Sequence, residues 1–147
     1  MSHVAAAQEL LSRFSVPAID IAVVLGSGWA GASAGLGQTI GECDLAELPG
    51  FAKPVVAGHG GNLRLIRTTT GKVAALFNGR THFYEGRGTG PVVHGVRTAA
   101  AAGASVIVLT NGCGGLNPEW GAGTPVLIRD HINLTGATPL EGATFID

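Results

Sequence analysis

The run from Arg80 to Tyr84 places three side chains that can bind a negatively charged ligand within five residues. Arg80 carries a fixed planar cation that can hold an oxyanion through two parallel hydrogen bonds. His82 follows two residues later and shares a face with Arg80 where the backbone is extended. Tyr84 adds an aromatic face and a hydroxyl group, which suit a sugar or a base. This spacing predicts an anion site with an aromatic surface beside it.

Two glycine-rich stretches supply further hydrogen-bond donors. Ser27 lies between Gly26 and Gly28, where a hydroxyl group and bare backbone amides can form an anion nest. His59 lies in the flexible stretch 58–61. Together with the arginine and the second histidine, these residue types predict a pocket for a phosphate or a carboxylate.

Each of these residues also has a structural interpretation. Taken singly, Arg80 is more often a surface ion-pair residue, and His59 and His82 are more often hydrogen-bonded structural histidines. The glycines around Ser27 can simply form a tight exit from a strand. Glu85 is better explained as a local hydrogen-bond partner than as a catalytic acid.

The sequence argues against a metal centre and against a dinucleotide site. Gly26, Gly28 and Gly31 spell G-x-G-x-x-G, but the stretch 30–37 carries three glycines, and each costs a helix interior about 1 kcal/mol relative to alanine. A dinucleotide-binding domain is therefore a distant alternative. No two histidines have short metal-ligand spacing with a carboxylate; the five are His3, His59, His82, His94 and His131.

Alternating helices and strands must position these residues. Apolar periodicity predicts helices over 1–14 and 90–103, the second ended by Gly103. Apolar runs rich in β-branched residues predict buried strands at 19–25 and 105–109, a hairpin over 63–77 and a short strand at 126–128. We therefore expect an α/β fold with a mixed, mostly parallel central sheet flanked by helices.

The polar clusters follow the predicted strands. They are Gly26-Ser27-Gly28, the stretch 78–86, the stretch 110–115 and Arg129-Asp130-His131. Ligands of open α/β sheets bind outside the carboxyl ends of the strands. We therefore expect all four clusters to meet at one crevice.

Composition excludes several classes of protein. The chain has 147 residues, of which 46% are hydrophobic and 13% charged, so it suits one globular domain and not a disordered segment. Nine Lys and Arg against ten Asp and Glu leave a net charge of −1, which predicts neither nucleic acid nor a membrane as a partner. Without a signal peptide or an apolar run long enough to span a bilayer, and with two widely spaced cysteines expected to be reduced, we expect a cytoplasmic protein.

Five motifs in register resemble the trimeric purine nucleoside phosphorylases, of the guanosine and inosine type. They are Gly-Ser-Gly at 26–28, Gly58-His59-x-Gly61, Gly79-Arg80-x-His82-x-Tyr84-Glu85-Gly86, Thr110-Asn111-x-x-Gly114-Gly115-Leu116-Asn117-Pro118 and Asp130-His131-Ile132-Asn133-Leu134. The resemblance runs from residue 20 to the end of the chain. It implies that residues 1–147 are the N-terminal part of a single nucleoside phosphorylase domain.

The resemblance implies phosphorolysis of purine ribo- or deoxyribonucleosides in nucleoside salvage, which releases the base and a pentose 1-phosphate. Inorganic phosphate would be the co-substrate, with no metal and no organic cofactor, and the family forms homotrimers. The implied phosphate-binding groups are Ser27, His59, Arg80, His82 and the backbone amide of Gly112; the implied nucleoside-binding residues are Tyr84, Asn111 and Phe145; His82 and Asn111 are the implied catalytic pair.

The chain also departs from the family pattern. Gly112-Cys113 stands where the family usually has two small residues such as Ala-Ala. The family's chain continues beyond this length, and its later half carries the groups that recognise the purine. We therefore expect uncovered apolar faces on the sheet and little or no turnover by these 147 residues alone. The alternative function is a truncated, inactive remnant that still binds phosphate.

Overall fold

The computed structural model describes residues 2–52 and 61–140 of the chain. Their helices and strands are α1 (Ser2–Arg13), β1 (Ile21–Leu25), β2 (Gly37–Asp44), β3 (Asn62–Thr68), β4 (Val73–Asn78), α2 (Thr89–Ala101) and β5 (Val106–Leu109). Three 3₁₀ helices lie between them: η1 (Ala30–Ser33), η2 (Leu45–Glu47) and η3 (Phe83–Glu85). Both predicted α-helices, the hairpin and the strands near 19–25 and 105–109 are confirmed.

The five strands form one mixed sheet in the order β2-β3-β4-β1-β5. β1 lies in the middle of its parallel part, paired with β4 on one side and β5 on the other. The β3–β4 hairpin and the β2–β3 pair are antiparallel. The mixed α/β sheet is thus confirmed, with parallel and antiparallel pairings equal in number among the described strands.

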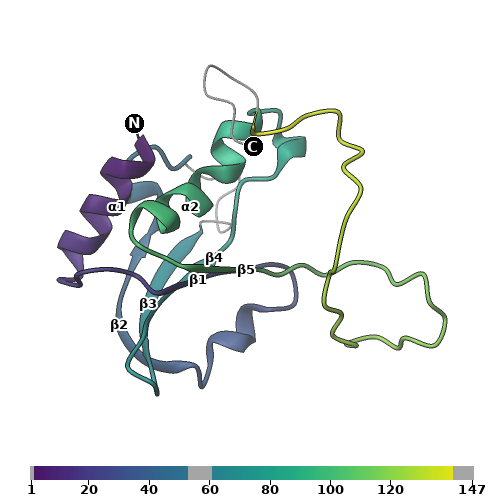
Figure 1. Ribbon diagram of the computed structural model, residues 1–147, viewed down its shortest axis with the longest axis horizontal. Helices are drawn as coiled ribbons and strands as arrows, with labels where there is room; N and C mark the ends of the chain where they lie inside the picture. Colours follow the sequence, from purple (N-terminus) through teal and green to yellow (C-terminus); the bar gives the residue numbers. More distant parts are fainter. Residues whose placement is uncertain (1, 53–60, 141–147) are drawn as a thin grey trace.

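Both helices pack over one face of the sheet (Figure 1). Alternate residues of the strands point to that face, so Val24 of β1, Leu65 of β3 and Phe77 of β4 join Leu10 of α1 and Ala99 of α2 in the main core. The opposite face has a smaller apolar cluster built from Leu25, Ile66, Ala74 and Leu76. The period of two in the strands and of 3.6 in the helices therefore builds one layer of helices on one sheet.

β5 was expected to be buried, and that prediction is wrong. Its side chains Val106, Val108 and Leu109 are 51%, 42% and 64% exposed. The strand forms one edge of the sheet, so only one of its sides pairs, with β1, and no described element packs over these side chains. This result agrees with the expected uncovered apolar face.

The predicted strand at 126–128 does not form. Val126, Leu127 and Ile128 lie in an irregular, exposed stretch and pair with no described strand. An isolated three-residue strand has no partner for its backbone N–H and C=O groups, so its apolar composition cannot make it a strand. In Figure 1 the described chain after β5 leaves the sheet and makes a wide excursion before it returns to α2, where the Arg97 side chain donates to the Pro139 carbonyl.

No helix in the described part of the chain is long and apolar enough to cross a membrane. Both cysteines are free: Cys43 is half-buried and Cys113 is exposed.

Candidate functional site

Three of the four polar clusters meet at one edge of the sheet. β1, β4 and β5 run parallel, with Leu25 opposite Asn78 and Val24 opposite Leu109, so all three strands end at the same edge. The residues that follow them therefore approach one another, as the sequence predicted. The fourth cluster, Arg129-Asp130-His131, is exposed and follows no strand, because the strand expected before it is absent.

Gly26 marks the point where the three clusters come closest. A Cβ atom on Gly26 would lie 2.4 Å from the carbonyl oxygen of Thr110, 2.9 Å from Cα of Asn111 and 3.0 Å from Nη1 of Arg80. No side chain fits in this space without moving backbone. The glycine therefore allows the ends of β1 and β5 to lie close together beside the Arg80 guanidinium.

Thr110 fixes the exit of β5 against the exit of β1. Its hydroxyl group accepts a hydrogen bond from the backbone N–H of Gly26 and donates one to the carbonyl of Val24, both at 2.9 Å. Its backbone N–H also donates to the Val24 carbonyl, at 3.0 Å. This positioning role was not predicted from the sequence, although a threonine directly after a strand is the signal that was available.

Ser27 and Gly112 lie in contact. A Cβ atom on Gly112 would lie 3.1 Å from the Ser27 carbonyl oxygen and 3.9 Å from Ser27 Cβ. The indole N–H of Trp29 donates to the carbonyl of Asn111 at 3.1 Å, which ties the loop after β1 to the loop after β5. The sequence did not predict this hydrogen bond.

His82 and Tyr84 are held next to each other by η3. The backbone N–H of His82 donates to Oε1 of Glu85 at 2.7 Å, while the His82 side chain accepts a hydrogen bond from the backbone N–H of Glu85. The rings of His82 and Tyr84 stack with centroids 4.8 Å apart and planes 12° from parallel. Glu85 is therefore the local hydrogen-bond partner that the sequence indicated, and Tyr84 stays 82% exposed.

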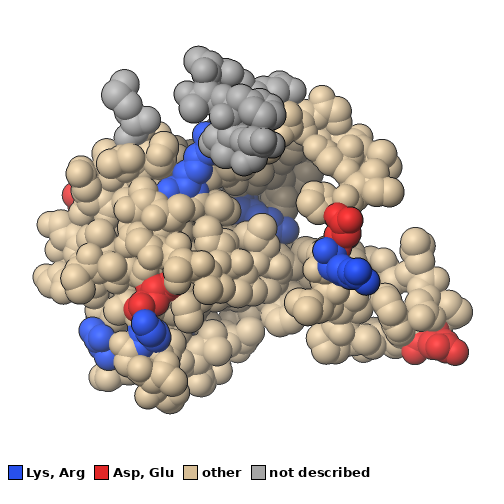
Figure 2. Space-filling view, viewed as in Figure 1, with Lys and Arg blue, Asp and Glu red and all other residues tan. Residues whose placement is uncertain are grey.

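A cavity of about 700 Å³ opens beside these groups. Its polar wall includes Ser27, Arg80, His82 and Tyr84. Its apolar wall comes from Phe77, Leu109 and Phe51 and from three valines of α2, Val92, Val93 and Val96. A cavity of this volume with a few convergent polar groups is typical of small-molecule sites. Figure 2 shows a hollow between the compact part of the molecule and the segment after β5, with Lys or Arg surface inside it.

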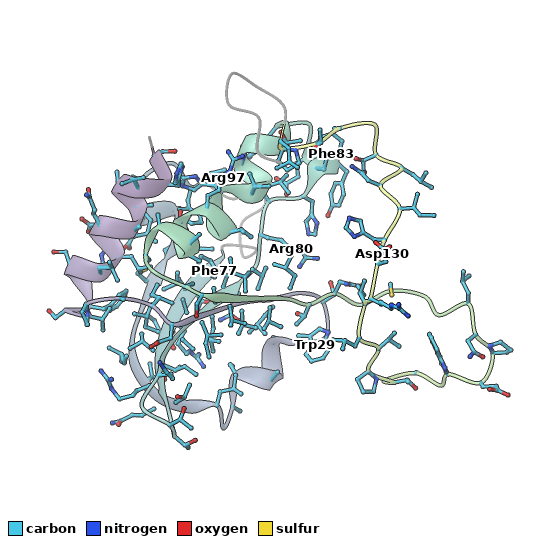
Figure 3. All side chains as sticks on the ribbon, in the orientation of Figure 1. Trp29, Phe77, Arg80, Phe83, Arg97 and Asp130 are labelled. Carbon is cyan, nitrogen blue, oxygen red and sulfur yellow. The ribbon has the colours of Figure 1, made fainter. Side chains whose placement is uncertain are left out.

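Arg80 is the uncompensated charge of this cavity. Among the residues that the structure describes, no acidic side chain lies within ion-pair distance of it. The acidic residues in the cavity wall are already engaged, since Glu85 binds the His82 amide and lies 3.7 Å from Arg87, and Asp44 accepts from the backbone N–H of Ala46. Figure 3 shows Arg80 near the ends of the strands, where it lines the cavity. The ion-pair interpretation of Arg80 therefore finds no partner among the described residues, and this exposed guanidinium is available to an anion that enters the cavity.

Two predicted site residues lie outside the described residues, namely His59 and Phe145. Asn111 and Gly112 lie beside the cavity, through their approaches to Gly26 and Ser27. The dinucleotide interpretation loses its structural basis, because Gly31 lies within the four-residue η1 and does not open an α-helix that could direct its N-terminus at a pyrophosphate.

Comparison with known proteins gives a consistent result. Residues 2–147 match the family model described as the phosphorylase superfamily. The chain is 56% identical over 147 residues to a purine nucleoside phosphorylase of a Cellulomonas species, covering 97% of this chain and 52% of the relative. It is 49% identical over 142 residues to that of Mycobacterium tuberculosis, covering 97% of this chain and 53% of the relative.

Solved structures show the same likeness. Schistosoma mansoni purine nucleoside phosphorylase in complex with acetate superposes with a TM-score of 0.68 at 27% identity, over 80% of this chain and 42% of that one. A purine nucleoside phosphorylase in complex with ribose-1-phosphate gives a TM-score of 0.68 and 27% identity over 79% of this chain. The chain spans about half the length of the curated relatives it matches. A family match over nearly all its residues, on a sheet whose three parallel strands end beside one cavity, places this chain in the phosphorylase superfamily.

Proposed function

We propose that the chain supplies the phosphate and ribose side of a purine nucleoside phosphorylase. The observation that carries the proposal is the convergence of Ser27, Arg80 and the 110–112 stretch at the ends of three parallel strands. Its relatives at 49–56% identity are named purine nucleoside phosphorylases. On this proposal residues 1–147 are the N-terminal part of one phosphorylase domain.

The reaction is the cleavage of a purine (deoxy)ribonucleoside by inorganic phosphate. A phosphate oxygen forms a bond to C1′ as the glycosidic C–N bond breaks. The electron pair of the C–N bond leaves with the purine, which takes up a proton. The products are the free base and (deoxy)ribose 1-phosphate. Because C1′ develops oxocarbenium character, the protein must hold an anionic nucleophile beneath it.

We assign the phosphate to Ser27, Arg80, His82 and the amide of Gly112, and also to His59, which is not among the described residues. The Arg80 guanidinium supports this, because it has no carboxylate partner among the described residues and a planar cation can give two parallel hydrogen bonds to one phosphate. The close approach of Gly112 to Ser27 also supports the assignment of both residues to one site.

We assign the nucleoside to Tyr84 and Asn111, with Phe145 as a further residue outside the described part. The exposed Tyr84 ring, stacked on His82, offers a ribose-sized surface next to the anion. His82 and Asn111 are the proposed catalytic pair. The wider proposal includes a role in purine salvage, a cytoplasmic location, a homotrimeric assembly and phosphate as a co-substrate without an organic cofactor.

The second candidate function is phosphate binding without turnover. The exposed apolar side chains of β5 favour it, because a purine pocket needs cover on the leaving-group side. The experiment is phosphate-dependent cleavage of inosine by the purified 147-residue chain, run beside thermal unfolding with and without phosphate. Arg80→Ala is the test variant. Arg67→Ala is its control, since Arg67 lies on the hairpin, is not in the lining of the cavity, and has a side chain that donates to the Gly71 carbonyl at 3.4 Å.

The outcomes separate the two functions. Cleavage that needs phosphate and is lost in Arg80→Ala supports the phosphorylase. No cleavage, with phosphate stabilisation that Arg80→Ala weakens and Arg67→Ala retains, supports the binding remnant. No cleavage and no phosphate stabilisation in the unsubstituted chain overturns both.

A further inference from the structure

A second cavity, of about 330 Å³, lies between the start of α1 and the first turns of α2. It is lined by Ser2, His3, Gly50, Gly90, Pro91, His94 and Arg97, and it shares only Pro91 with the lining of the first cavity. Figure 3 shows Arg97 on the α2 side, close to α1 and apart from Arg80. The proposed phosphorolysis does not use this cavity.

The described lining of this cavity is basic. Its ionisable side chains are His3, His94 and Arg97, and none of the residues that line it is acidic. Burial lowers the pKa of His3, and positive charges around the ring, those of Arg97 and His94 among them, lower it further. The cavity thus has a positive potential that the described residues leave unbalanced.

The basic groups are held in place. His94 is 6% exposed, and its Nε2 donates to the Pro49 carbonyl at 2.9 Å, because a carbonyl oxygen can only accept. The ring also lies edge-on to Phe51, with centroids 4.6 Å apart. Arg97 donates one Nη2 hydrogen to the Pro139 carbonyl at 3.0 Å, and a guanidinium has five N–H groups in all.

Gly50 packs closely against both helices at the wall of the cavity. It has a φ of +77°, and a Cβ atom there would lie 2.5 Å from Ser2 Cβ and 2.8 Å from His94 Cε1. Glycine therefore lets its segment pack directly against these two side chains, which fixes their positions in the wall. The second residue of the 13-residue α2, Gly90, is also in the lining, where the positive end of the helix dipole adds to the basic side chains.

We propose that this cavity binds a small tetrahedral oxyanion of the size and charge of inorganic phosphate. Arg97 supplies the planar donor, His3 a ring N–H group that becomes charged when the imidazole takes up a proton, and Ser2 a hydroxyl group, so donors reach the anion from both helices. Such an anion links α1 to α2 and neutralises the positive potential between them. The proposal goes beyond phosphorolysis and does not depend on it.

The test follows His3 by the NMR titration of its ring C2–H signal, in phosphate and in chloride at equal ionic strength. A bound anion stabilises the imidazolium, so phosphate is expected to move the His3 titration to higher pH. His3→Gln identifies the signal by its loss. Arg80→Ala removes the proposed anion ligand of the first cavity and is expected to leave the shift of His3 unchanged.

Substitutions of Arg97 in the cavity wall, with a control substitution outside it, complete the test. Arg97→Gln is expected to abolish the phosphate-induced shift of His3, Arg97→Lys to retain part of it, and the hairpin variant Arg67→Gln to leave it intact. An identical His3 titration in phosphate and chloride overturns the proposal, as does a shift that disappears in Arg80→Ala. Arg80 variants that leave phosphate stabilisation unchanged contradict only the first site, so the two proposals fail independently.

Discussion

Gly26→Ala is the substitution that most directly tests how the site is built. The added methyl group would lie 2.4 Å from the Thr110 carbonyl oxygen and 2.9 Å from Asn111 Cα, which are backbone atoms that cannot rotate away. The residues after β5 must move away from the residues after β1. This movement strains the three hydrogen bonds of Thr110, one with the Gly26 N–H and two with the Val24 carbonyl. Overpacking of this kind costs about 1–3 kcal/mol.

The matched control is Gly31→Ala, five residues along the same loop. A Cβ atom there meets nothing within 4 Å, and Gly31 has no positive φ. A surface change of this kind stays within about 0.5 kcal/mol. Urea unfolding gives the free energy of unfolding of both variants, and the phosphate-induced rise in melting temperature reports the site.

We expect Gly26→Ala to lose stability and to lose the part of the phosphate response that arises at this site, while Gly31→Ala retains both. The displaced backbone carries Asn111 and the amide of Gly112 away from Ser27, so binding fails together with packing. The reasoning is refuted if Gly26→Ala unfolds at the same urea concentration as Gly31→Ala and responds equally to phosphate.

Three further predictions concern separate features of the chain. Hydrogen bonds from the Lys72 ammonium and from the backbone N–H of Val73 hold the pKa of Asp20 below its ordinary value. The Asp20 carboxylate therefore stabilises the folded state at pH values above its pKa in the unfolded chain. This stabilisation is lost as the pH falls through the pKa of Asp20 in the folded state. Asp20→Asn is therefore expected to lower the urea midpoint at pH 7 and not in strong acid. Burial raises the pKa of the Cys43 thiol, so a thiol reagent at pH 8 is expected to label the exposed Cys113 first, as peptide mass spectrometry would show, and equal labelling rates would contradict this. Trp29→Phe retains the ring but removes the hydrogen bond to the loop after β5, so phosphate binding measured by calorimetry is expected to weaken by about 0.5–1.5 kcal/mol, and unchanged affinity would exclude this tie from the site.

Local patterns predicted most of the fold because the responsible forces are local. The run from Ile21 to Leu25 is apolar and β-branched, and it forms the middle strand of the parallel part of the sheet. The Thr-Gly-Lys turn at 70–72 joins β3 to β4 as expected, with a positive φ of 81° at Gly71. Gly103 ends α2 for the same reason as Gly71 forms the turn, because glycine readily adopts a positive φ, here 102°.

The misses share a different cause. β2 has the sequence GQTIGECD, whose two glycines and four polar residues give no strand pattern, and it forms because β3 offers it an edge. The apolar stretch 126–128 has the composition of a strand but no partner. Strand formation depends on a neighbouring strand that is distant in sequence, and the β-propensity of a segment does not indicate whether such a neighbour exists.

The site divides in the same way. Ser27 and Arg80 were predicted because their residue types and their places after strands are visible in the sequence. The apolar wall from α2 was not predicted, because which valines line the cavity depends on how that helix packs against the sheet and α1. No local sequence pattern predicts the hydrogen bond from Trp29 to Asn111 either, because these residues are 82 positions apart.

The site draws on two parts of the molecule that must exchange their amide hydrogens at very different rates. Ser27 and Arg80 follow strands paired on both sides, whereas Gly112 begins an exposed segment joined to the rest by hydrogen bonds near its two ends, at Asn111 and at Pro139. Local opening of that segment removes the Gly112 amide from the site without unfolding the sheet. The apparent affinity for phosphate is then the intrinsic affinity multiplied by the fraction of time the segment is closed. A substitution near Pro139, far along the chain from the anion, can therefore weaken binding while the melting temperature stays the same.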